Sequence, residues 1–122
     1  MKTFAILIIS LLVSGCATVD IQKHAFKAQK VVRHGTGCMP TESLPEVAIF
    51  GSVSEIRKIA ERFSGKKFKG LAFYHPSSKT IFIYKWAATK IVIHELLHFY
   101  LTELFPNMTY NKQHILITKW GY

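Results

Sequence analysis

The chain has 122 residues, of which 49% are hydrophobic and 19% are charged. This length allows one compact domain, and the apolar content excludes an intrinsically disordered chain. Sixteen Lys and Arg against seven Asp and Glu give a net charge of +9. Such a basic surface attracts polyanions or suits a protein that works beside a negatively charged membrane, and we favour the second use.

The first residues have the pattern of an export signal. Lys2 is the only charge before an apolar run at positions 4–13, which is too short to span a bilayer and leads into Ser14-Gly15-Cys16. With Val13, this end resembles a bacterial lipobox, in which the chain is cut before the Cys and the Cys is lipidated. The resemblance implies a signal peptide over residues 1–15 and a lipid on Cys16, hence a membrane-anchored lipoprotein of the cell envelope. The alternatives are a secreted protein cut near Gly15 and a retained membrane anchor.

Residues 16–44 are expected to form the lipidated Cys and a basic tether. They are polar, basic and interrupted by turn-forming Gly and Pro, which predicts only local order. Lipidation of Cys16 leaves Cys38 without an intramolecular partner, whereas an unmodified Cys16 allows a Cys16–Cys38 disulfide. His34 lies close to Cys38 in sequence, and we interpret both as tether residues without a special role.

The compact domain is expected over residues 45–122. An apolar run that ends at Gly51 predicts a buried strand, and apolar residues at helical spacing then predict a helix that ends at Ser64-Gly65. Two further apolar segments flank a turn and predict a β-hairpin, with strands at 71–74 and 80–84. Together these elements predict an α+β domain with a small antiparallel sheet of about three strands.

A long helix is predicted from Ala87 or Ala88 to Phe105, where Pro106 ends it. Its residues are apolar on nearly every side, so we expect it to form the buried centre of the domain, with the sheet packed against it. A last helix is predicted at about 111–120.

The long helix contains His94-Glu95-Leu96-Leu97-His98. Two His four residues apart lie one above the other on a helix, so both imidazoles can reach one ion. Zinc binds neutral imidazole and activates a water molecule when its fourth position is open. Glu95 is rotated about 100° from His94 and can act as the general base of amide hydrolysis.

This segment resembles the HExxH helix of the zincin metallopeptidases. The resemblance implies a zincin-like fold in which His94 and His98 bind Zn²⁺ and Glu95 is the catalytic base. It also implies a strand that aligns the substrate beside the helix, a role for which the strand at 80–84 is the candidate. An ordinary hairpin strand is the equal alternative.

The third ligand follows neither the downstream Glu of thermolysin-like zincins nor the His after an intervening Gly of metzincins, but a downstream His ligand also occurs in minimal zincins such as the SprT-like group. The one acidic residue downstream of the motif, Glu103, lies about half a turn round the helix from His94 and points away. We therefore predict His114 as the third ligand, with His75 as the reserve choice. Tyr100, Tyr110 and His75 are the candidates for stabilising the oxyanion that develops during hydrolysis.

The sequence thus predicts a zinc metallopeptidase that acts on a peptide or protein substrate. We expect a monomer that is anchored to the membrane through Cys16 and has no specific nucleic-acid partner. Two alternatives stay open. One is a non-catalytic lipoprotein that binds zinc or peptides, and the other is an envelope-binding module in which the basic charge is the function.

Overall fold

The computed structural model describes residues 20–122. The predicted signal peptide, the lipid on Cys16 and the alternative Cys16–Cys38 disulfide therefore lie outside the described residues. The described part has four α-helices and a three-stranded sheet, which confirms the predicted α+β class. The elements are α2 (Ile21–Thr36), β1 (Glu46–Phe50), α3 (Val53–Ser64), β2 (Ala72–His75), the 3₁₀ turn η1 (Pro76–Ser78), β3 (Thr80–Tyr84), α4 (Thr89–Leu104) and α5 (Tyr110–Lys119).

The sheet has the strand order β1-β3-β2 and is mixed. β3 pairs with β2 in antiparallel fashion, as a hairpin must, but it pairs with β1 in parallel from Glu46 opposite Thr80 to Phe50 opposite Tyr84. The predicted all-antiparallel sheet is therefore wrong. The connection through α3 and β2 is long enough to return the chain to the same end of the sheet, which a parallel pair requires.

The central position of β3 also corrects the expectation that this strand aligns the substrate. The strand at 80–84 is flanked by β1 and β2, so it has no free edge on which a substrate could lie. Within the described residues the edge strand nearest to α4 is β2. The local pattern of a hairpin does not reveal which of its strands receives a distant third strand.

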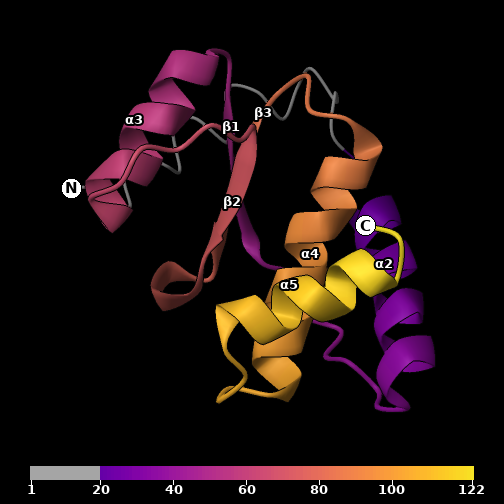
Figure 1. Cartoon of the computed structure of the whole chain (residues 1–122). Coiled ribbons are helices and arrows are strands. Elements are labelled where there is room, and N and C mark those ends of the chain that lie inside the picture. The colour runs from indigo at the N-terminus through magenta and orange to yellow at the C-terminus, as the bar shows by residue number, and fades with distance from the viewer. Residues whose placement is uncertain (1–19) are drawn as a thin grey trace.

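The two faces of the sheet pack against different helices. Alternate side chains of β1 and β3 point to opposite sides, so Phe82 joins Phe50 and Ile56 in a small cluster against α3. Ile81 and Ile83 join the larger core, to which α2, α4 and α5 contribute. Figure 1 shows α3 on one side of the sheet and these three helices on the other.

Residues 21–36 form a helix of the compact body, whereas the sequence predicted a tether there. Asp20 caps α2 by accepting a hydrogen bond from the Lys23 backbone N–H at 3.1 Å, and Gly37 ends the helix with φ of 75°. Ala25, Ala28 and Val32 are fully buried against α4. The apolar stripe consists mainly of small alanines among many basic residues, which is why its helical spacing is easily overlooked.

α4 is buried on two sides, by the sheet and by α2, and this explains its nearly all-round apolar surface. It ends immediately before Phe105 and Pro106, and Thr109 then caps α5 by accepting a hydrogen bond from the Lys112 backbone N–H at 3.2 Å. α5 lies across α4 (Figure 1). None of the helices in the described part of the chain is long and apolar enough to cross a membrane.

Candidate metal centre

Three histidines from two helices meet at one point. His94 and His98 are one turn apart on α4, with ring centroids 5.0 Å apart. The fold-back of α5 brings the His114 ring to 5.0 Å from that of His94 and 5.9 Å from that of His98. One ring nitrogen of each residue lies within 4.8 Å of the others, a spacing that small rotations of the rings would close around one ion.

The structure therefore brings together the three predicted ligands, whereas His75, the reserve choice for the third ligand, lies elsewhere. The ring of His75 stacks on Phe63 with centroids 4.2 Å apart, and its Nδ1 is 2.8 Å from the Ser78 hydroxyl. Glu103 also points away from the cluster, as predicted, and pairs with Lys79 at 3.4 Å.

A buried hydrogen-bond chain orients His98. Gln113 donates from Nε2 to the Thr102 hydroxyl at 2.9 Å, and Thr102 donates in turn to the His98 carbonyl at 2.8 Å. The Gln113 carbonyl oxygen is then left to accept from His98 Nδ1 at 2.8 Å. This arrangement places the imidazole proton on Nδ1, so that Nε2 carries a free lone pair.

The Nε2 atom of His98 is the clearest sign of a missing partner. It is buried, and within residues 20–122 it has no hydrogen-bond partner. A buried imidazole nitrogen without a partner is costly, and a metal ion would satisfy it. A second residue that fixes the other ring nitrogen, as Gln113 does here, is the usual support of a metal-binding His.

Burial favours the neutral form of His94 and His98. The pKa of His98 is lowered to about 4, mainly by burial; the nearby His94 and His114 act in the same direction, and the Gln113 hydrogen bond opposes them. Burial likewise lowers the pKa of His94. Because a metal binds the unprotonated ring, both residues are ready to coordinate at neutral pH.

Glu95 lies beside the cluster and is almost fully buried, with 8% of its surface exposed. Burial raises its pKa to about 8, and a hydrogen bond from the Tyr74 backbone in β2 partly opposes this shift. Glu95 and His94 together line a cavity of about 270 Å³, which the segment leading into β2 closes at Gly70, Leu71 and Ala72. In the described part of the chain, the group that could hold a metal ion comprises the three histidines without Glu95.

Of the three candidates for oxyanion stabilisation, Tyr110 is the one at the cluster. Its ring stacks on His98 with centroids 4.7 Å apart and planes 7° from parallel, and 65% of its surface is exposed. Tyr100 is fully buried, where its hydroxyl accepts a hydrogen bond from Gln29 at 2.9 Å and joins α4 to α2. Tyr100 and His75 thus make their contacts with residues other than the three histidines.

Sequence reasoning did not find Gln113, although it precedes His114 directly. A polar residue on an amphipathic helix normally faces solvent, and only the crossing of α5 over α4 buries it. Cys38 is a free, partly buried thiol in the segment after α2, away from the three histidines.

Comparison with known families, curated proteins and solved structures finds no match. The function is therefore argued from the site itself.

Proposed function

We propose that the chain is a zinc-dependent peptidase of the zincin type, in which His94, His98 and His114 hold the ion and Glu95 is the general base. The observation that carries this proposal is the convergence of three imidazoles beside the buried Glu95, which lines a cavity together with His94. Zinc, when bound by three imidazoles, supplies Lewis acidity and lowers the pKa of water at its open position.

The other residues of the site have roles that follow from their positions. Glu95 in its ionised form accepts a proton from the attacking water and passes it to the leaving amine, and its raised pKa makes that ionised form a stronger base. The hydroxyl of Tyr110, on the exposed side of His98, donates to the developing oxyanion. Leu71 and Ala72, beside the cavity, position the substrate backbone.

We further propose that a lipid on Cys16 anchors this peptidase at the cell envelope. Ile21, the first residue of α2, follows Cys16 by only five positions in sequence. The compact body would then lie close to the membrane surface, where its positive charge favours contact with anionic headgroups.

A zinc-binding protein without catalysis is the main rival. A structural zinc site closes with four protein ligands, whereas the group in residues 20–122 has three. A buried carboxylate next to such a site, kept out of the ligand set and facing a cavity, favours catalysis.

The test compares Glu95→Gln with the parent protein. Both are loaded with zinc, and cleavage of a peptide mixture is followed by mass spectrometry. We expect full zinc occupancy in the variant and a loss of turnover of about 10²- to 10⁴-fold, because the proton acceptor is removed while the ligands stay.

Glu103→Gln is the matched control, since Glu103 lies on the same helix and pairs with Lys79 away from the cluster. It should keep its turnover. Equal turnover in Glu95→Gln and the parent would remove Glu95 from the mechanism, and a parent that binds no zinc would refute the site.

A further inference from the structure

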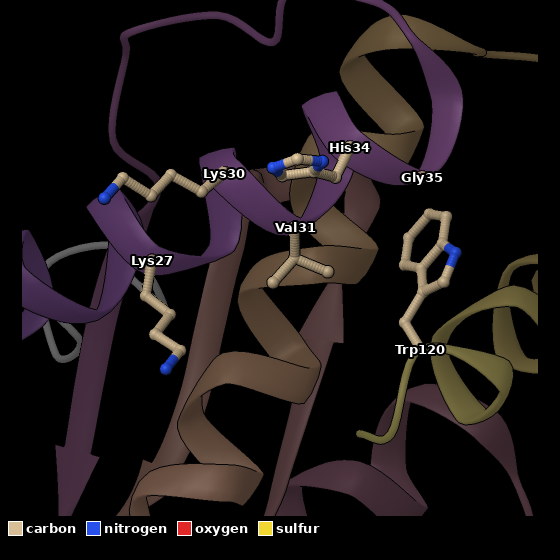
Figure 2. A pocket seen from close by; sticks show the side chains of 6 residues that line it. All are labelled: Lys27, Lys30, Val31, His34, Gly35 and Trp120. Atoms are coloured by element: carbon tan, nitrogen blue, oxygen red, sulfur yellow. The ribbon is translucent and has the colours of Figure 1, made fainter.

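Three hollows follow one another along the surface, neighbouring hollows share lining residues, and the last is lined by the candidate catalytic residues. The first has a volume of about 490 Å³ and lies between α2 and Trp120 (Figure 2). The second, of about 650 Å³, shares Lys27 and Trp120 with the first. The third is the 270 Å³ cavity at His94 and Glu95, and it shares Lys90 and Tyr122 with the second.

This row of hollows, called here the basic groove, is lined by positive charge. Its first two hollows are lined by Lys23, Lys27, Lys30 and Lys90, and no Asp or Glu lines them. None of these four lysines forms an ion pair within residues 20–122, although the Lys30 ammonium lies over the Phe26 ring, 4.8 Å from its centroid. Asp20, which precedes α2, is engaged in capping the helix. A groove lined by one sign of charge concentrates the field and attracts a ligand of the opposite sign.

The basic groove also has an apolar side. Figure 2 shows the Trp120 ring across the first hollow from Lys27 and Lys30, with Val31 between them. The ring sits directly against Gly35, where a Cβ atom would overlap the indole. The groove therefore offers an aromatic surface for apolar side chains beside lysines for anionic ones.

We propose that the basic groove binds an acidic polypeptide segment and guides it toward His94 and Glu95. This inference rests on the proposed function, because the groove ends at the residues to which peptide hydrolysis is assigned. A polypeptide suits the lining better than a uniform polyanion does, since carboxylates can meet the lysines while neighbouring apolar side chains contact Trp120 and Val31. The substrate class would then be proteins or peptides with an acidic stretch beside the cleaved bond.

The test uses the full chain in detergent with two peptides that share a core and differ in flanks of Glu or Gln. Binding is measured on zinc-loaded Glu95→Gln protein, so that affinity is read without cleavage. Trp86→Phe in the same background leaves Trp120 as the one tryptophan, because the chain has two. Its fluorescence should change on addition of the acidic peptide.

Lys27→Gln/Lys30→Gln is compared with Lys58→Gln/Lys67→Gln, which removes the same charge from exposed positions in and after α3. We expect the groove variant to lower the preference for the acidic peptide by about tenfold at low salt, and the control to leave it unchanged. An equal loss in both variants would overturn the proposal, since net charge alone would then explain binding.

Further measurements distinguish the competing ligands, and they distinguish a failure of the groove proposal from a failure of the peptidase proposal. Displacement of the peptide by phosphatidylglycerol vesicles or by a single-stranded oligonucleotide at lower concentration would assign the groove to that polyanion and overturn the proposal. Binding of the acidic peptide without turnover in the parent would refute the peptidase and keep the groove. Turnover of both peptides with equal kcat/KM would keep the peptidase and refute the groove.

Discussion

The carboxyl group of Glu95 is almost fully buried, and its titration changes the free energy of unfolding of the metal-free protein. Burial raises its pKa from 4.5 to about 8, so between these values the folded chain binds more protons than the unfolded chain. The free energy of unfolding must then fall as the pH rises. His24, His94 and His98, whose pKa values are lowered, act in the opposite direction, because unfolded imidazoles take up protons around pH 6.5.

The difference between the parent protein and Glu95→Gln isolates Glu95, because both contain the same histidines. We expect the metal-free parent to lose about 2 kcal/mol of its free energy of unfolding relative to Glu95→Gln between pH 6.5 and 8, measured by urea denaturation. The same pH dependence in both proteins over this range would contradict the burial of an ionisable carboxyl here.

Gln113 fixes the His98 ring by accepting a hydrogen bond from its Nδ1 at 2.8 Å. Gln113→Leu removes the acceptor of the Nδ1 proton, and we expect zinc affinity to fall by about 10- to 100-fold, measured by competition with a chelator. Gln113→Glu keeps an acceptor at this position and should retain most of the affinity. Unchanged affinity in Gln113→Leu would show that the hydrogen bond does not tune the site.

At the residue scale, the sequence predicted the parts of the site that local geometry determines. His94, Glu95 and His98 follow from helical spacing alone, and His114 required only that α5 fold back. The choice of Tyr110 over Tyr100 could not be predicted, because it depends on which face of α4 receives α2.

α2 is the element on which the structure and the sequence-based expectation differ most. If the helix belongs to the compact body, Val32→Ala leaves a cavity between α2 and α4, because Val32 is fully buried. We expect a cost of about 2 kcal/mol in the free energy of unfolding, measured by urea denaturation. Arg33→Ala, at the neighbouring exposed position, should change it by less than about 0.5 kcal/mol. A tether would make both variants neutral.

The remaining elements show what periodicity can and cannot predict. Helices α3, α4 and α5 and the hairpin of β2 and β3 were predicted within a few residues, because each has strong caps or apolar periodicity. The parallel pairing of β1 with β3 was missed, since it joins segments about 30 residues apart and leaves no local trace in either.

At the scale of the whole molecule, the three histidines link the two helices that carry the C-terminal half of the fold. His94 and His98 belong to the buried helix α4, and His114 belongs to α5. In a domain of this size the apolar core is small, so a metal that binds only the folded chain adds substantially to stability. The basic groove extends from α2 to the cavity lined by His94 and Glu95.

X-ray absorption at the zinc edge of the purified full chain tests the metal centre most directly. We predict one zinc per chain, bound by three imidazole nitrogens at about 2.0–2.1 Å and one further light atom, with one imidazole lost in His114→Ala. Spectra that require sulfur or four protein ligands, or a chain that takes up no zinc, would contradict it.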